Sequence, residues 1–278
     1  MGKFDGILIV TDIDGTFLGN KSRKVPENFE AIEYFKANGG VFTFASGRLH
    51  YSIDRVIPNP EKVANAPFIL ANGSCLYDFS LRKSVLTDCL NGHEAIPIFK
   101  YVREKYKTVG IRISSEIGFV VDELNDIIKR DLANIDPGEI RVIPVDEWGS
   151  IESDWFKVVL RDSAERLDAI REDLESKFPD AFECCKSAPT FYELQRKGCT
   201  KASAISKLKG LLKEQTGLDY TVYACGDFEN DIAMLKAADV AVCPENALDT
   251  VKAVCDHTLC HCDKGLIADL VRMLDSKI

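Results

Sequence analysis

The chain has 278 residues, 44 acidic against 35 basic, and a formal net charge of −9. Such a charge repels a nucleic-acid backbone on average, and no run of basic residues indicates a local groove, so we expect no nucleic-acid partner. Apolar residues make up 46% of the sequence, as in ordinary globular proteins, and no stretch approaches the roughly 18 apolar residues of a membrane span.

The first residues lead directly into a strand-like segment, without the apolar stretch and small-residue cleavage site of a secretory signal. We therefore expect a cytoplasmic protein with no membrane partner, whose ten cysteines are reduced thiols rather than disulfides. The length favours one large or two modest domains.

The N-terminal third alternates strand-like and helical segments. Strands are predicted at 7–11, 41–45 and 68–71, and a helix at 26–38, where Phe29, Ile32 and Phe35 recur at helical spacing before a Gly-Gly stop. A strand, a helix and a second strand in this order form a βαβ unit of a parallel sheet.

The same alternation returns near the C-terminus. Thr200 can cap a helix at 201–213, followed by a strand at 221–225, a helix at 231–237, a short strand at 240–243 and a last helix from Gly265 to the end. We interpret the two terminal segments as halves of one sheet.

The middle of the chain has a different pattern. Helical stretches at 93–106, 123–134 and 163–177 are interleaved with strand-like runs at 109–113, 117–121, 155–160, 182–185 and 190–194, the last two forming a hairpin. The predicted fold is α/β: a Rossmann-like parallel-sheet core domain from residues 1–82 and 195–278, with an inserted α+β cap domain at 83–194.

The strongest motif follows the first predicted strand, where Asp12, Asp14, Gly15 and Thr16 stand in the run DIDGT. In open parallel sheets, ligands bind outside the carboxyl ends of the strands, so the two carboxylates are directed at a site. A simple Asp-Gly turn is the alternative.

Two further motifs fit an anion site. Ser46, Gly47 and Arg48 follow the second predicted strand, where a hydroxyl, an open amide and a helix N-terminus can hold phosphate; an ordinary strand-to-helix turn is the alternative. Lys201 stands in the first helical turn, which is unfavourable for the helix dipole unless an anion lies nearby. The alternative there is a solvated lysine on a surface helix.

The fourth motif follows the strand at 221–225, where Asp227, Asn230 and Asp231 stand in the run GDFEND. Together with the acids of the first motif they offer the hard oxygen ligands that Mg²⁺ prefers, whereas zinc or iron would favour histidine or thiolate. Several acids at one crevice require cations, which Mg²⁺ and Lys201 would supply.

The ordered set of motifs resembles the haloacid dehalogenase superfamily, and Asn72-Gly73, Ala237-Ala238-Asp239 and Glu245-Asn246-Ala247 resemble its Cof-type sugar-phosphatase branch. The resemblance implies Asp12 as nucleophile and Asp14 as general acid and base. It also implies that Ser46 and Lys201 bind the transferring phosphoryl group.

The metal would be held by Asp12, Asp227 and the Asp14 backbone carbonyl, with Asp231 and Asn230 serving its water shell or orienting the site. The wider set of predicted phosphate- and substrate-binding residues comprises Gly15, Thr16, Ser46, Gly47, Arg48, Asn72, Lys201 and Asn230. For Asn72, a plain Asn-Gly turn is the alternative. Cys225 stands where the family has a small residue, and Cys243-Pro244-Glu245 where it has a more glycine-like stretch; neither departure touches the proposed chemistry.

We therefore predict a Mg²⁺-dependent phosphatase acting on a small phosphorylated metabolite, sugar phosphates first and phosphorylated cofactors such as pyridoxal phosphate or flavin mononucleotide second, and we expect a monomer. The alternatives are a phosphomutase, for which residues 83–194 offer no convincing basic cluster, and a non-catalytic phosphometabolite-binding regulator, against which the complete set of acids argues.

Cys255, His257, Cys260, His261 and Cys262 form the densest group of soft ligands. Their spacing does not match the paired Cys-x2-4-Cys or His-x3-5-His pattern of zinc sites. We expect a short strand at 257–262 with half-buried side chains, and zinc is the alternative.

Overall fold

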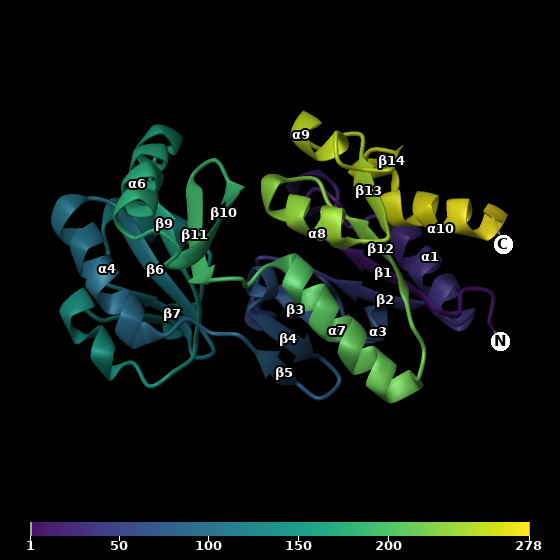
Figure 1. Cartoon of the computed structure of the whole chain (residues 1–278), viewed down its shortest axis with the longest axis horizontal. Coiled ribbons are helices and arrows are strands. Elements are labelled where there is room, and N and C mark those ends of the chain that lie inside the picture. The colour runs from purple at the N-terminus through teal and green to yellow at the C-terminus, as the bar shows by residue number, and fades with distance from the viewer. Residues whose placement is uncertain (1, 278) are drawn as a thin grey trace. The chain divides into compact units, whose positions relative to one another are not determined.

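Segments from both ends of the chain form one parallel sheet in the computed structural model, which describes residues 2–277 (Figure 1). Its strand order is β14-β13-β12-β1-β2. The strands are β1 (Ile7–Thr11), β2 (Val41–Phe44), β12 (Thr221–Cys225), β13 (Val240–Pro244) and β14 (His257–Leu259). Because β1 lies between β2 and β12, the predicted union of the two terminal segments in one α/β sheet is confirmed.

Helices cover both faces of this sheet because successive residues of a buried strand point to opposite sides. Leu8 and Val10 of β1 lie in a core with side chains of two of the helices, whereas Ile9, also fully buried, points to the opposite face. Those two helices, α7 (Lys201–Thr216) and α8 (Ile232–Ala237), contact each other, and α1 (Pro26–Ala37) packs against α10 (Leu266–Lys277) (Figure 1). Shorter helices are α2 (His50–Ile53), α3 (Pro60–Val63) and α9 (Asp249–Lys252).

The third predicted strand belongs to a different sheet. β3 (Phe68–Leu70) pairs antiparallel with β4 (Cys75–Asp78), and β5 (Lys83–Thr87) completes this three-stranded sheet. A single parallel bridge from Ala45 to Ile69 joins β3 to the end of β2. The predicted strand at 68–71 was therefore wrong in its pairing, because the chain reverses at Ala71 and returns as a hairpin.

Residues Thr87–Cys199 form a second compact unit, and the segments up to Leu86 and from Thr200 form the first. The second unit contains a six-stranded sheet of order β10-β11-β9-β6-β7-β8, antiparallel except for β7 with β8. Its strands are β6 (Gly110–Ser115), β7 (Gly118–Val121), β8 (Ile140–Val142), β9 (Trp155–Arg161), β10 (Phe182–Ala188) and β11 (Phe191–Arg196).

Two helices, α4 (Gly92–Lys105) and α6 (Ala164–Lys177), pack on one face of that sheet through a core that includes Phe99, Ile113 and Leu167. The predicted hairpin of the last two strands is confirmed. The predicted helix at 123–134 is shorter, α5 (Asp126–Asp131), because the Asn125 side chain accepts the Ile128 amide and so caps the helix late.

The predicted strand at 257–262 also ends early, at Leu259. Beyond it, side chains take the place of strand partners: an Asp269 carboxylate oxygen accepts the Cys260 amide at 3.1 Å, and Asn246 Oδ1 accepts the Cys262 amide at 3.0 Å. Strands β4, β5 and β8 were not predicted; β5, exposed at four of its five positions, carries almost no alternation of apolar and polar residues.

Within residues 2–277, none of the helices combines the length and the apolar character required to cross a lipid bilayer.

We predict that Asn28→Ala lowers the free energy of unfolding by about 1–3 kcal/mol or more, since each buried polar group left without its partner costs about 1–3 kcal/mol. The fully buried Asn28 donates to the Phe17 carbonyl (2.8 Å) and accepts the first amides of α10 from Ile267 (3.0 Å) and Ala268 (3.1 Å). Urea unfolding measures the change. Asn38→Ala is the matched control, because Asn38 caps the C-terminus of α1 and its side chain makes an exposed hydrogen bond to the Tyr34 carbonyl. This change should cost under about 1 kcal/mol. Equal losses in the two variants would contradict the capping of α10 by Asn28.

Candidate active site

The register of the central strands brings the first and fourth motifs to the same edge of the sheet. Thr11, the last residue of β1, pairs with Cys225, the last residue of β12. Asp12 and Asp227 therefore follow adjacent parallel strands, and the Asp12 amide donates to the Cys225 carbonyl at 2.8 Å. Two acids far apart in sequence become neighbours because parallel strands end at a common edge.

Lys201 lies between two of the acids. Its Nζ is 2.6 Å from Asp12 Oδ1 and 2.7 Å from Asp231 Oδ1, and the residue is only 1% exposed. The alternative of a solvated surface lysine is therefore wrong. A buried ammonium requires such partners, because removal from water penalises an isolated charge by several kcal/mol.

The start of α7 fixes the backbone of Lys201. The Thr200 side chain accepts the Ser203 amide, and the Ser203 hydroxyl accepts the Thr200 amide, both at 3.0 Å. This reciprocal cap determines where the helix begins. The lysine is thereby held in the first turn, with its side chain directed at the acids.

Burial and mutual repulsion dominate the electrostatics of the cluster. Burial raises the pKa of Asp12 well above its ordinary value, Lys201 opposes this, and Asp231 and Asp227 add to it. Burial and the neighbouring Asp231 raise the pKa of Asp227 to about 7, against the hydrogen bond from Thr16. For Lys201, burial disfavours the ammonium, but Asp12 and Asp231 outweigh that effect and raise its pKa. The site thus favours additional positive charge.

Asp231 also shapes the loop that carries Asp227. Its second carboxylate oxygen accepts the amides of Asp227 at 3.0 Å and Phe228 at 3.1 Å. A Cβ on Gly226 would lie 2.6 Å from the Asp231 Cγ, so the loop closes only around glycine. One carboxylate therefore binds Lys201 on one side and the Asp227 loop on the other.

Gly15 and Thr16 connect the first motif to the fourth. The Thr16 hydroxyl donates to Asp227 Oδ1 at 2.7 Å. Gly15 has a φ of +82°, and a Cβ there would lie 3.0 Å from the Asp227 Cγ. The Gly15 carbonyl accepts the Asn246 side-chain amide at 2.8 Å. Sequence reasoning gave Asn246 no role, since only the fold brings it to the first motif.

The acids fit a hard divalent cation. Asp12, Asp227 and Asp231 each offer a carboxylate oxygen, all within 4.8 Å of one another. An all-oxygen donor set suits Mg²⁺ better than zinc, which favours histidine or thiolate ligands. The Asp14 carboxylate does not belong to this cluster, which leaves its backbone carbonyl as the donor that the sequence analysis proposed.

The second motif has its own hydrogen bonds. Ser46 is 2% exposed, and its Oγ accepts the Arg48 amide across Gly47 at 3.2 Å. The Arg48 guanidinium binds both carboxylate oxygens of Asp14, with Nε at 2.6 Å and Nη2 at 2.8 Å. The side chain predicted to bind phosphate is thus paired with an acid of the first motif.

Three consecutive residues after β3 adopt left-handed backbone conformations: Ala71 (φ +49°), Asn72 (+54°) and Gly73 (+110°). The Ala71 amide donates to the Arg48 carbonyl at 2.9 Å, and the Asn72 amide donates to the Ser46 carbonyl at 3.0 Å. Positive φ is unfavourable for residues with a Cβ, so these tertiary hydrogen bonds hold the turn in place.

The same turn touches the remaining motifs. Asn230 donates from its side chain to Asn72 Oδ1 at 3.2 Å. A Cβ on Gly73 would overlap the Thr200 carbonyl group, 2.5 Å from its carbon, and would lie 3.1 Å from the Lys201 nitrogen. The sequence predicted Asn72 as a substrate contact. It did not predict that Asn72 bonds to Ser46 of the second motif and to Asn230 of the fourth.

The family profile of the haloacid dehalogenase-like hydrolases matches residues 9–270. The chain belongs to this family. Together with the phosphatases to which the chain is similar, this match makes it an enzyme of the phosphoric monoester hydrolase class and confirms the Cof-type resemblance.

Curated relatives of this hydrolase cover most of its length. A 5-amino-6-(5-phospho-D-ribitylamino)uracil phosphatase of Bacillus subtilis is 29% identical over 255 residues, covering 90% of this chain and 88% of its own. The pyridoxal phosphate phosphatase YbhA of Escherichia coli is 25% identical over 253 residues, covering 88% and 90%. Among solved structures, TM0651 of Thermotoga maritima superposes with a TM-score of 0.76 at 26% identity, covering 96% of this chain and 97% of its own.

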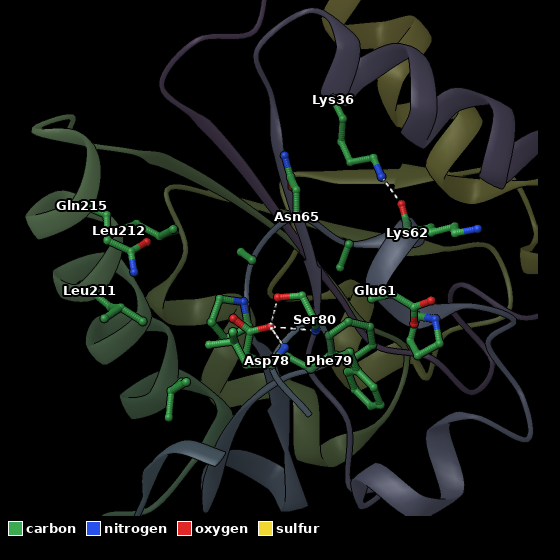
Figure 2. Close-up of a pocket in the computed structure, with 17 residues that line it drawn as sticks. Lys36, Glu61, Lys62, Asn65, Asp78, Phe79, Ser80, Leu211, Leu212 and Gln215 are labelled. Atoms are coloured by element: carbon green, nitrogen blue, oxygen red, sulfur yellow. Dashed lines mark hydrogen bonds between the residues drawn. The ribbon is translucent and has the colours of Figure 1, made fainter. Parts of the chain in front are cut away.

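The hydrolase also has a pocket of about 430 Å³ near the start of β3, beside α3 and the second half of α7 (Figure 2). Several of its polar groups already bind one another: Lys36 donates to the Lys62 carbonyl, and Asp78 Oδ1 accepts from the amide and hydroxyl of Ser80 and the amide of Leu81. The pocket contains none of the motif residues and is distinct from the acidic site.

The Cys/His segment forms hydrogen bonds with the loop that follows the first motif. His261, Cys262 and Asp263 place ligand atoms within 4.8 Å of one another. However, His261 Nδ1 accepts the Asp263 amide at 3.1 Å, and the Asp263 carboxylate binds the Asn20 amide at 2.9 Å and Arg23 at 3.2 Å. These groups hold the loop after the first motif, and this hydrogen-bond pattern does not favour the zinc alternative.

We predict that Gly73→Ala lowers both stability and turnover, because a methyl group must displace the Thr200 carbonyl and with it the start of α7 that carries Lys201. Urea unfolding and hydrolysis of p-nitrophenyl phosphate measure the two effects.

Two controls, one at the C-terminal cap of α7 and one within it, separate steric overlap from backbone strain. Gly217 has a φ of +73°, and a Cβ there would meet nothing within 4 Å, so Gly217→Ala carries backbone strain alone, about 1–2 kcal/mol. Gly210 lies within α7 without a positive φ, and a Cβ there would meet nothing within 4 Å. Gly210→Ala should therefore stabilise the helix by about 0.5–1 kcal/mol. If Gly73→Ala costs no more than Gly217→Ala and keeps full turnover, the turn does not position Lys201.

Proposed function

We propose that this hydrolase is a Mg²⁺-dependent phosphatase that hydrolyses small phosphorylated metabolites through an aspartyl-phosphate on Asp12. The observation that carries the proposal is the buried Lys201 ammonium shared by Asp12 and Asp231, beside Asp227 at the carboxyl edge of the parallel sheet. A cation and a cluster of acids at one edge suit phosphoryl transfer, which depends on positioning and charge.

Asp12, Asp227, Asp231 and the Asp14 backbone carbonyl would hold the metal, directly or through water. When bound, Mg²⁺ supplies positive charge that stabilises a transferring phosphoryl group. The nucleophile, the general acid and base, and the groups that bind the phosphoryl oxygens would all come from the protein.

Asp12 is the proposed nucleophile because it lies at the strand end with one carboxylate oxygen on Lys201. An aspartate nucleophile splits hydrolysis into phosphoryl transfer to the carboxylate and attack of water on the resulting acyl phosphate. In the first step the bond from phosphorus to the leaving oxygen breaks as the bond to an Asp12 oxygen forms. Water then cleaves the acyl phosphate to inorganic phosphate and regenerates the carboxylate.

Asp14 is the proposed general acid and base. Its side chain is 46% exposed, whereas that of Asp12 is 10% exposed, so Asp14 can exchange protons with a leaving group and with water. It would protonate the leaving alcohol in the first step and take a proton from water in the second.

The equatorial phosphoryl oxygens would be bound by Lys201, the Ser46 hydroxyl and the backbone amides near Gly15, Thr16 and Gly47. Asn72 and Asn230, which are hydrogen-bonded to each other, would orient the site or contact substrate. A buried hydroxyl, a buried ammonium and amides next to glycine suit the small, multiply charged phosphoryl group.

Residues 87–199 would act as a cap that recognises the leaving group and excludes water. The unit has its own hydrophobic core, so its sequence can change without disturbing the acidic site. The relatives named for pyridoxal phosphate and for a phosphoribitylaminouracil support a phosphorylated cofactor or precursor as substrate, alongside the sugar phosphates predicted from the sequence.

We predict that turnover of p-nitrophenyl phosphate and of a phosphometabolite panel requires Mg²⁺. A chelator should reduce the rate to background, and added Mg²⁺ should restore it, because the clustered carboxylates need a hard cation. Thermal unfolding with and without Mg²⁺ provides a readout apart from activity, since a bound ion raises the melting temperature. Undiminished turnover in chelator, with the fold intact, would overturn the metal assignment.

We further predict that Asp14→Ala accumulates the phosphoenzyme. With p-nitrophenyl phosphate the leaving group is already a stable anion, so the first step needs little acid catalysis, while the second loses its base and slows by about 10²–10⁴-fold. The expected results are a burst of p-nitrophenol and a phosphate-sized mass increase on the peptide carrying Asp12. Asp12→Asn, which removes the nucleophile, should show neither. A folded Asp14→Ala enzyme without burst or mass increase would refute the assignment of one of the two acids.

A further inference from the structure

Arg48 of the second motif and Asp14 of the first form a side-chain pair next to the acidic cluster. Arg48 Nε donates to Asp14 Oδ2 at 2.6 Å, and Nη2 donates to Oδ1 at 2.8 Å, so both carboxylate oxygens are bound in the fork-to-fork geometry. This geometry fixes the plane of the carboxylate as well as its position. A single hydrogen bond would leave the carboxylate free to rotate.

We propose that Arg48 is a positioning residue that orients the Asp14 carboxylate for proton transfer, and that it does not serve as a ligand of the phosphoryl group. The inference rests on the proposed role of Asp14 as general acid and base. It assigns Arg48 a task that the motif pattern did not indicate.

The proposal explains how an exposed acid is oriented. Lys201 orients Asp12 and Asp231 inside the protein, where their side chains are 10% and 1% exposed. The side chain of Asp14 is 46% exposed, and packing constrains such a group weakly. The two hydrogen bonds from Arg48 supply the constraint.

Arg48 can orient Asp14 because its own backbone is fixed. Its amide donates to the buried Ser46 Oγ at 3.2 Å, and its carbonyl accepts the Ala71 amide at 2.9 Å. The strand-end turn and the left-handed turn therefore both hold the residue. Direct hydrogen bonds thus connect the left-handed turn to the Arg48 backbone and the Arg48 guanidinium to Asp14.

The energetic consequence concerns turnover more than binding. Proton transfer requires the donor within hydrogen-bond reach of the reacting oxygen, and a displacement of about 1 Å can cost about 10²-fold in rate. Loss of the arginine would leave Asp14 present but disordered. A phosphate-binding arginine would instead weaken substrate binding whether or not Asp14 were intact.

A double-mutant cycle separates these roles. Arg48→Ala, Asp14→Asn and the double variant are assayed with β-glycerol phosphate, whose alkoxide needs protonation. We expect Arg48→Ala to lower kcat about 10–100-fold with KM changed less than about threefold, and the double variant to match Asp14→Asn within about twofold. Independent losses that multiply in the double variant would overturn the proposal, as would a rise in KM with unchanged kcat.

Chemical rescue gives a second readout. Millimolar guanidinium, well below denaturing concentration, should restore part of the turnover of Arg48→Ala and none in the double variant, because the added cation acts only through Asp14. Rescue of both variants alike would contradict the proposal. Arg48→Lys keeps the charge without the planar fork and should retain a clear defect in kcat; it also provides a test if Arg48→Ala does not fold.

Arg82→Ala is the matched control for the loss of an arginine. It removes an exposed arginine that pairs with Asp54 and should leave kcat and KM unchanged. If wild-type enzyme and Asp14→Asn turn over equally, the proposed function of Asp14 fails. If Asp14→Asn is impaired and Arg48→Ala is not, the positioning role alone fails.

Discussion

The buried Lys201 ammonium is the interaction on which the arrangement of the site depends. It lies between Asp12 and Asp231, and Asp231 in turn binds the amides of the loop that carries Asp227. Removing the cation would leave carboxylates buried together, which repel one another and lack water. The charge that would act on a phosphoryl group therefore also holds the acids together.

Backbone geometry is the second constraint. The left-handed turn at 71–73 accepts unfavourable φ values and makes hydrogen bonds to the Ser46 and Arg48 carbonyls, while Gly73 leaves room for the Thr200 carbonyl. Strain of this kind persists when surrounding contacts over-determine it. The second and third motifs meet around this turn, through the Ser46 and Arg48 carbonyls on one side and the Thr200 carbonyl on the other.

The site also combines buried acids with an exposed one. Asp12 and Asp231 are enclosed and oriented by Lys201, whereas Asp14 is half exposed and oriented by Arg48. A nucleophile benefits from a fixed position, and a group that exchanges protons needs access to solvent. In the proposed cap role, the compact unit at 87–199, which has its own core, would allow recognition of the substrate to vary while this arrangement of acids is kept.

The amino-acid sequence by itself determined the family, the α/β class, the course of β1, α1, α7 and β12, and the motif residues, because apolar periodicity and short motifs are local properties. Other features depended on hydrogen bonds that apolar periodicity does not reveal. The left-handed turn and the link from Asn246 to Gly15 result from hydrogen bonds between segments far apart in the sequence. The pairing of β3 with β4 and the early end of β14 involve nearer residues, whose backbone turns and side-chain partners became visible only in the structure. Arg48 shows the difference most clearly: the sequence placed it beside an anion site, but only the tertiary structure directed its guanidinium to Asp14, since a side chain's partner depends on which segments the fold brings together.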